Sequence, residues 1–592
     1  MKKRNAVALA VFLAFVMVMV ALGLLIAFAL GQANFNPRML AGKTILQVDL
    51  ETAVLEYVPP DPIAQLTMKE APQMRPLVEA LTRAATDDDV VGLIARVGQG
   101  GLGIAQLQEI RDAVIAFRAA GKPAYAYAET FGEVSSGNAS YYLATAFDKI
   151  YLQPAGDVNV TGLMLASSFF RGTLDKLGIV PRLGHRYEYK NARNVYTETE
   201  MTAAHREASE SLMRSIFEQM TQGMAEGRDL SVDELKQRIA AGPYYGQEAV
   251  DAGLVDGLAY RDEVYDEIEQ ATDGRASFQN LRPYLQQAGR VWGKGTTVAL
   301  IYGVGGITRG ESQYSPLNGS ANMGSDTVAT AFRAAVEDSK VKAILFRIDC
   351  NGGSYVASDT VLREVTRARE AGKPVIVSMG NVAASGGYFV AAEADKIVAQ
   401  PSTITGSIGV VGGKLVTAGL WEKIGLSWDA VETSANASMW SANYDYTDEQ
   451  WARQSDWLDR VYEDFTARVA AGRDLPLDKV REIAKGRVWT GVQAKELGLV
   501  DALGGYTVAI DLVREALGLE PGASIKLRPF PVPKTFWQGF VDQVPSGSEL
   551  AIIAAAQVLE SVRPLVVLAG RAGLVETPPE TLAVPEELIP RP

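Results

Sequence analysis

The chain has 592 residues, too many for one hydrophobic core, so we expect two or more domains. Its 57 basic and 70 acidic residues give a net charge of −13, which argues against nucleic acid as a partner because that partner requires a basic surface. The single cysteine excludes an intrachain disulfide, and two histidines are too few for a structural zinc site with about four ligands. We expect no metal and no other cofactor.

The N-terminus combines a basic cluster with a long apolar run. Residues 1–5 contain Lys2, Lys3 and Arg4, and the run Ala6–Leu30 is uncharged and almost wholly apolar. About 20 such residues span a bilayer as a helix, and a basic cluster favours a cytoplasmic N-terminus. We therefore expect a transmembrane anchor over 6–30, with the rest of the chain exported. A cleaved signal peptide is the alternative, because 27–29 read Ala-Phe-Ala.

The sequence repeats itself at a nearly constant interval. Asp-Lys-Ile, followed by Gln-Pro, occurs at 148–154 and again at 395–401, an interval of 247 residues (395 − 148). Gly-Leu-Val-Asp occurs at 253–256 and again at 498–501, an interval of 245 residues (498 − 253). We therefore predict an internal duplication. It comprises an N-terminal repeat at 45–272, a linker at 273–295 and a C-terminal repeat at 296–520.

Each repeat begins with the same predicted elements. An apolar run (90–97; 341–349) ends near a glycine pair, an amphipathic stretch follows (104–117; 356–369), and Gly-Lys-Pro opens a second apolar run (124–128; 375–379). Strand, helix and strand in this order form a βαβ unit of a mostly parallel sheet, so the predicted fold class is α/β. Ligands of such sheets bind beyond the carboxyl ends of the strands, where both glycine pairs lie.

The remaining segment resembles neither repeat. Residues 521–575 form a C-terminal extension whose apolar part contains Glu560, Arg563, Pro564 and Arg571. This composition fits a core helix, an oligomer contact or an interfacial helix better than a second membrane span. Residues 576–592 are rich in proline and glutamate, so we expect them to be disordered.

Ser385 follows the second predicted strand of the C-terminal repeat and precedes Gly386 and Gly387. Small residues at a strand-to-helix turn leave a serine hydroxyl uncovered and let a substrate approach. A helix N-cap serine has the same local pattern, so the motif alone does not decide the role of this serine. The matching residue of the N-terminal repeat is Asn138 (385 − 247), so the nucleophile is expected only in the C-terminal repeat.

The glycine pair Gly352-Gly353 ends the preceding strand and is expected beside the Ser385 turn. An N–H group there could join that of Gly386 as an oxyanion hole, in which one donor is typically worth about 3 kcal/mol. A tight turn that needs a positive φ is the alternative interpretation.

A serine nucleophile needs a base, and Lys190 of the N-terminal repeat is the candidate. The matching span of the C-terminal repeat, 434–437, has no lysine, so the repeats together supply one nucleophile and one base. To act near pH 7, a lysine pKa must fall by roughly three units from about 10.4, which burial between the repeats would cause. A surface lysine beside Glu188 is the ordinary alternative. His185 is the rival base because it needs no shift, but a triad would also require a carboxylate that we cannot identify.

Three segments resemble signal peptide peptidase A (protease IV) in its long, duplicated form, the serine peptidase family S49. They are Ala384–Tyr388, Gln400–Gly409 and Tyr189-Lys190, and the resemblance extends from the anchor to about Glu520. It implies two tandem ClpP/crotonase-like domains after one transmembrane helix. It also implies a dyad of Ser385 as nucleophile and Lys190 as general base and acid.

The resemblance further implies oxyanion donors at Gly353 and Gly386, although Cys350-Asn351 stand where the family has Ser-Pro. It implies a homotetramer bound to lipid of the bacterial inner membrane, with the catalytic part on the periplasmic side. The expected substrates are signal peptides and other apolar peptides. Two other classes stay open, namely a crotonase-like acyl-CoA hydratase or hydrolase and a non-catalytic membrane scaffold. Export argues against the first, because CoA is cytoplasmic.

Overall fold

The computed structural model describes residues 42–531, apart from 60–63, 65–67, 69–70, 99, 273 and 316–319. The expected basic N-terminus at 1–5, the anchor at 6–30, the tail at 576–592 and most of the extension at 521–575 therefore lie outside the described residues. Within the described ranges, no helix is both long enough and apolar enough to cross a bilayer.

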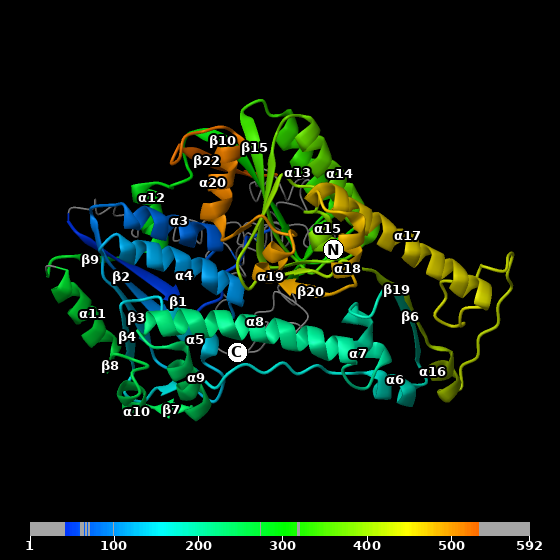
Figure 1. The fold of residues 1–592 in the computed structure, drawn as a ribbon, viewed down its shortest axis with the longest axis horizontal. Helices are drawn as coiled ribbons and strands as arrows, with labels where there is room; N and C mark the ends of the chain where they lie inside the picture. Colours follow the sequence, from blue (N-terminus) through cyan, green and yellow to red (C-terminus); the bar gives the residue numbers. More distant parts are fainter. Residues whose placement is uncertain are drawn as a thin grey trace, which may run out of the picture.

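The N-terminal half is built on a parallel sheet with the strand order β8-β4-β3-β2-β1-β9. Its strands are β1 (Thr44–Leu50), β2 (Val90–Val97), β3 (Ala124–Ala128), β4 (Lys149–Leu152), β8 (Gly257–Leu258) and β9 (Ser277–Asn280). The strands predicted at 90–97 and 124–128 have these bounds. The central strand β3 is buried along its whole length, because helices cover both faces of the sheet (Figure 1).

The C-terminal half repeats this arrangement in a sheet with the main path β20-β18-β16-β15-β10-β22, from which β17 pairs with β16 and β21. Its strands are β10 (Thr296–Val304), β15 (Val341–Cys350), β16 (Val375–Ala384), β17 (Lys396–Ala399), β18 (Ile404–Gly406), β20 (Val488–Thr490), β21 (Ala502–Leu503) and β22 (Ile525–Phe530). All pairs are parallel except β18 with β20. The chain is therefore a mixed α/β protein, as predicted. The strand predicted at 375–379 is longer and ends directly before Ser385.

Helices surround both sheets (Figure 1). In the N-terminal half they are α3 (Met74–Ala85), α4 (Ile104–Ala119), α5 (Asn138–Ala144), α6 (Arg171–Leu177), α7 (Asn194–Thr197), α8 (Ala203–Gly227), α9 (Val232–Ala241), α10 (Gln247–Asp251), α11 (Arg261–Ala271) and α12 (Leu281–Ala288). In the C-terminal half they are α13 (Ser325–Glu337), α14 (Tyr355–Glu370), α15 (Gly386–Phe389), α16 (Ala418–Lys423), α17 (Asp448–Arg473), α18 (Leu477–Ile483), α19 (Gly491–Glu496) and α20 (Tyr506–Ala516). The predicted helices at 104–117 and 356–369 correspond to α4 and α14.

The two halves repeat individual contacts as well as strand order. The hydroxyl of Tyr141 donates to the carbonyl of Leu254 at 2.6 Å, and the hydroxyl of Tyr388 donates to the carbonyl of Leu499 at 2.8 Å. The two tyrosines are 247 residues apart (388 − 141), and the two leucines belong to the repeated Gly-Leu-Val-Asp motif. The interval found in the sequence is therefore also present in the tertiary contacts.

The segment at 273–295, expected to be a linker, contains regular structure and belongs to the N-terminal half. Its strand β9 pairs with β1, and its helix α12 buries Tyr284 and Leu285 in the core. In the same way β22 pairs with β10 beyond residue 520, so each half ends in an edge strand. The sequence pattern missed β9 because its residues are only partly buried and form no apolar run.

The halves meet along several elements. Strand β6 (Val180–His185) pairs antiparallel with β19 (Val411–Val416) at one end of the molecule (Figure 1). The long helix α8 reaches the second sheet, where the hydroxyls of Ser215 and Thr490 lie 2.9 Å apart. One hydrophobic cluster also includes residues of both sheets. Because Lys190 follows β6 in the chain, this pairing carries it to the C-terminal half.

Candidate active site

Ser385 occupies a sharp turn between β16 and α15. Its φ of 54° and ψ of −120° are strained values for a residue with a side chain. Its N–H donates to the carbonyl of Gly406 at 2.8 Å, which holds the turn in place. A Cβ atom at Gly387 would lie 2.4 Å from the carbonyl oxygen of Cys350, so only glycine fits there. The strand-to-helix turn expected from the sequence is present and leaves the hydroxyl at the end of β16.

Lys190 reaches this hydroxyl from the other half of the chain. Its side chain is 5% exposed, and its Nζ lies 3.0 Å from Oγ of Ser385. Backbone of the C-terminal half covers the lysine closely, since a Cβ at Gly486 would lie 2.6 Å from Cβ of Lys190 and one at Gly409 would lie 3.4 Å from its Cδ. The N–H of Tyr189 also donates to the carbonyl of Lys485 at 3.1 Å. The two residues lie 195 positions apart in the sequence (385 − 190) and are in hydrogen-bond contact.

Ser407 completes the surroundings of the amine and was not singled out from the sequence. Nζ of Lys190 lies 2.8 Å from the carbonyl oxygen of Ser407 and 3.0 Å from its Oγ. The φ of Ser407 is 50°, so this residue is also strained. The only signal for it was its place in the segment Gln400–Gly409, which carries the family resemblance.

Burial lowers the pKa of Lys190 to about 7, because a charged amine loses its hydration in this position. A large fraction of the amine is therefore neutral near pH 7. A neutral amine has two N–H groups and one lone pair. The two oxygen atoms of Ser407 can accept both N–H groups, which leaves the lone pair for the proton of Ser385.

The glycine pair expected near Ser385 lies against it. A Cβ at Gly352 would be 2.8 Å from both the Gly386 nitrogen and Cβ of Ser385. A Cβ at Gly386 would be 3.1 Å from the nitrogen of Gly353, so the two candidate oxyanion donors lie close together. The sulfur of Cys350 accepts the N–H of Gly352 at 3.3 Å and so helps to fix this turn without a proline.

His185, the rival base, lies on β6 opposite Val411. None of the hydrogen bonds of the described residues joins it to Ser385. Burial, followed by the charge of Arg193, lowers its pKa below the ordinary value. The geometry therefore favours Lys190 over His185 as the neighbour of the nucleophile.

In the part of the chain that the structure describes, no group of three His, Cys, Asp or Glu side chains is arranged to hold a metal ion. The chemical groups that meet here are a hydroxyl, an amine of lowered pKa and two glycine N–H groups, which suits acyl transfer.

The sequence matches peptidase family S49 over residues 116–274 and 367–520, one match in each half. It is 32% identical over 456 residues to Protease 4 of Salmonella typhi, covering 75% of this chain and 72% of that protein. It is 30% identical over 468 residues to the chloroplastic serine protease SPPA of Arabidopsis thaliana, covering 78% of this chain and 68% of that protein.

Among solved structures, the chain is similar to a ClpP1 mutant from Listeria monocytogenes, with a TM-score of 0.23, 13% identity, and coverage of 36% of this chain and 94% of that chain. The matches to S49 in both halves and the extended similarity to two proteases settle the family and its chemistry. The chain belongs to peptidase family S49 and is a serine endopeptidase that acts on peptides.

Proposed function

We propose that Ser385 is the nucleophile and Lys190 its general base and acid. The observation that carries this proposal is the 3.0 Å separation of Nζ and Oγ, together with the burial of the amine. Neutral Lys190 takes the hydroxyl proton as Oγ bonds to the carbonyl carbon of the substrate. The resulting ammonium gives a proton to the leaving amine, and an acyl-enzyme forms. A water molecule then attacks the ester while Lys190 again acts as base.

We propose Gly353 and Gly386 as the oxyanion donors. Gly386 is the first residue of α15, so its N–H is one of the free donors of a helix N-terminus. Within the described ranges, the N–H of Gly353 makes no backbone hydrogen bond, so it is available as the second donor. Two donors aimed at one place stabilise the negative oxygen that forms during attack.

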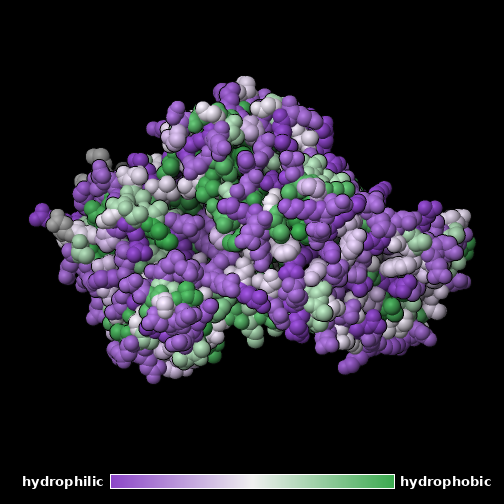
Figure 2. All heavy atoms as spheres, in the orientation of Figure 1, coloured by the Kyte–Doolittle hydropathy of each residue, from purple (hydrophilic) through white to green (hydrophobic). Residues whose placement is uncertain are grey.

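We propose that the natural substrates are signal peptides and other apolar, extended peptides, and that a span at 6–30 anchors the protein in the bacterial inner membrane with its catalytic part in the periplasm. The basic and apolar pattern of residues 2–30 supports the anchor. Figure 2 shows hydrophobic residues gathered near the middle of one face, between the α3–α4 side and the α13–α14 side, whereas the ends of that face are mainly hydrophilic. Such a surface suits an apolar chain.

We propose that the chain assembles into a closed homotetramer of ClpP/crotonase-like halves. Lys176-Leu177-Gly178-Ile179 leads into β6, which pairs with β19. The matching sequence 247 residues later (423 − 176), Lys423-Ile424-Gly425-Leu426, leads into a segment in which every residue from 422 to 437 is exposed. Trp428 and Val431 in this segment are 51% and 101% exposed.

A second copy that covers this segment as β19 covers β6 would bury these apolar side chains, and repetition of that contact would close a ring. Trp428→Asp should then lower the mass measured by light scattering to that of a smaller species. An unchanged mass would count against this contact.

The dyad is tested with a fluorophosphonate, which labels an activated serine. The wild-type protein should be labelled and should cleave an apolar fluorogenic peptide, whereas Ser385→Ala should show neither activity. Lys190→Ala should lower kcat/KM by roughly 10⁴-fold, as expected for loss of a base that acts together with its nucleophile. His185→Ala is the matched control and should retain activity. The proposal fails if the His185 variant loses activity and the Lys190 variant keeps it.

A further inference from the structure

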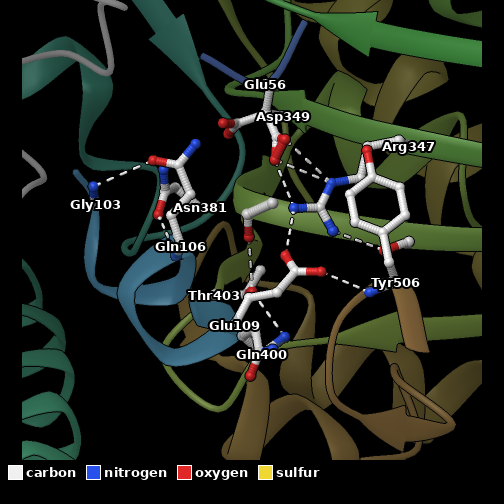
Figure 3. A network of polar contacts seen from close by, with 12 residues as sticks. Glu56, Gly103, Gln106, Glu109, Arg347, Asp349, Asn381, Gln400, Thr403 and Tyr506 are labelled. Carbon is white, nitrogen blue, oxygen red and sulfur yellow. Dashed lines mark hydrogen bonds and ion pairs between the residues drawn. The ribbon is translucent and has the colours of Figure 1, made fainter. Parts of the chain in front are cut away.

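A buried ionic network lies behind the active-site strands and joins the two halves (Figure 3). Arg347, on β15, is fully buried and donates to Glu56 at 3.1 Å and to Glu109 at 2.7 Å, both from the N-terminal half. It also donates to the hydroxyl of Ser378 on β16 at 2.8 Å. Because loss of one partner would leave an uncompensated buried charge, these contacts hold β15 and β16 firmly against the N-terminal half.

Asp349, on the same strand, fills a bulge in the neighbouring strand. β15 and β16 pair regularly up to Ile348, but the register then shifts and Cys350 pairs with Ala383. β16 therefore has extra residues at this point, whose N–H groups need an acceptor other than the β15 backbone. Oδ1 of Asp349 accepts the N–H of Val382 at 3.0 Å.

Asn381 links the same bulge to the N-terminal half. Its N–H is the second group bound by the Asp349 carboxylate. Its side-chain oxygen accepts the N–H of Gln106 at 3.1 Å, in the first turn of α4 (Figure 3). Gly103 leaves room for this contact, because a Cβ there would lie 2.2 Å from the same oxygen. The bulge is thus held from one side by a carboxylate and from the other by a helix of the other half.

We propose that Asp349 is a positioning residue for the peptidase reaction, whose carboxylate fixes the bulge at 380–382 and thereby sets where Ser385 and the Gly352-Gly353 turn meet. The proposal rests on the proposed role of Ser385 as nucleophile. Asp349 lies on β15 just before the glycine turn and binds β16 just before Ser385, so a shift of its carboxylate moves both strands. Displacement of reacting groups by about 1 Å can cost about 100-fold in rate.

Charged groups surround the Asp349 carboxyl and change its pKa, and its charge sets how strongly it binds the backbone N–H groups. Glu56 and Arg347 face it, and Glu109 accepts from the same Nη2 of Arg347 as Glu56 does. The ring of Tyr506 lies 4.5 Å from the guanidinium carbon. Burial, followed by the charge of Glu56, raises the pKa of Asp349 to about 7. Above that pH the ionised carboxylate binds the two N–H groups most strongly.

The test uses the full-length protein and two substitutions of graded severity. Asp349→Asn keeps one acceptor but turns an NH₂ group toward the second N–H, and should lower kcat about 10-fold. Asp349→Leu removes both acceptors and should lower kcat about 100-fold. KM for a fluorogenic peptide should stay within about twofold, because Asp349 does not contact the substrate. The rate of fluorophosphonate labelling should fall with kcat, while the final labelled fraction stays complete.

The matched control is Asp501→Asn. Asp501 also accepts a strand N–H, from Ile397 of β17 at 2.7 Å, and pairs with Arg473 at 2.6 Å. β17 pairs with β16 only at residues 376–378, away from the end of β16 that carries Ser385. It should lower Tm without changing kcat or the labelling rate. The proposal is wrong if Asp349→Leu is labelled at the wild-type rate, or if only its final labelled fraction falls while the rate stays normal. It is also wrong if Asp501→Asn slows labelling equally. Activity remaining in Ser385→Ala would instead refute the proposed nucleophile.

Discussion

Arg96 and Arg347 lie at corresponding positions of β2 and β15, yet their surroundings differ completely. The side chain of Arg96 is 22% exposed and pairs with Glu51, Asp49 and Glu129, which are 25%, 48% and 55% exposed. Arg347 and its two carboxylate partners are at most 3% exposed. The same residue type therefore makes surface ion pairs in the N-terminal half and a buried link between the halves in the other. The strand is present in both halves, but only the arginine of the C-terminal half, Arg347, joins the two halves.

The position of the proposed nucleophile also has different surroundings in the two halves. Because Tyr141 and Tyr388 make the same hydrogen bond, Asn138 corresponds to Ser385 without a shift of register. The Asn138 side chain donates to the carbonyl of Gly162 at 2.8 Å and accepts its N–H at 3.3 Å. It thus closes a loop, whereas the hydroxyl of Ser385 is left for Lys190. In the proposed mechanism, one half carries the nucleophile, and the other supplies the base and the structural support.

The largest effect is expected when the nucleophile is moved between the halves. Ser385→Ala combined with Asn138→Ser should remain more than about 10⁴-fold below the wild-type kcat/KM. A serine at 138 would face Gly162 rather than a lysine, and it would also lose the loop contacts. Hydrolysis of a fluorogenic peptide and fluorophosphonate labelling measure this. A labelled serine in the double variant would show that the halves are chemically interchangeable.

The two arginines should differ strongly in their contribution to stability. Arg347→Met leaves buried carboxylates without a partner and should lower the free energy of unfolding by about 3–5 kcal/mol. Arg96→Met removes exposed ion pairs and should change it by about 0–1 kcal/mol. Urea titration followed by tryptophan fluorescence compares them. Equal losses would mean that the difference in burial has no energetic consequence.

Gly353→Ala tests the oxyanion turn. The φ of Gly353 is 155°, and a Cβ there would lie 2.2 Å from the carbonyl oxygen of Ile307, so the N–H must move. We expect kcat to fall about 10²–10³-fold, as for the loss of one oxyanion donor. Gly372→Ala is the control, because its φ is also positive, at 74°, but nothing lies within 4 Å of the added atom. Steady-state kinetics should show normal kcat in this control.

The smallest expected effect is the change of kcat/KM with each unit of pH. Only the neutral form of Lys190 accepts a proton, and its pKa is about 7. Lowering the pH below 7 protonates the amine, so kcat/KM should fall by at least about tenfold per pH unit and level off above pH 7. Protonation of Asp349, whose pKa is also about 7, should steepen the fall in the same range. A pH–rate profile measures this limb. Activity that rises as the pH falls from 7 to 5 would contradict a lysine base.

Part of this site could be predicted from sequence because duplication provides an internal comparison. The interval of 247 residues paired Ser385 with Asn138, and the tyrosine contacts show the same register. Ser407 and Asp349 were missed. Both differ between the repeats, since Asp349 corresponds to Gly98 (349 − 251) and Ser407 corresponds to Leu163, each directly after Thr-Gly. That difference alone does not show their role, because that role comes from atoms contributed by distant segments. The strand β9 was missed because it lacks an apolar run.

The sequence by itself determined the α/β class, the duplication and the residue types available for acyl transfer, because these depend on periodicity and on local turn chemistry. Only the tertiary structure decided that Lys190 is buried against Ser385 and that Arg347 joins the halves. The physical reason is that burial and distance across 195 residues depend on how two sheets pack, and local sequence does not specify that packing.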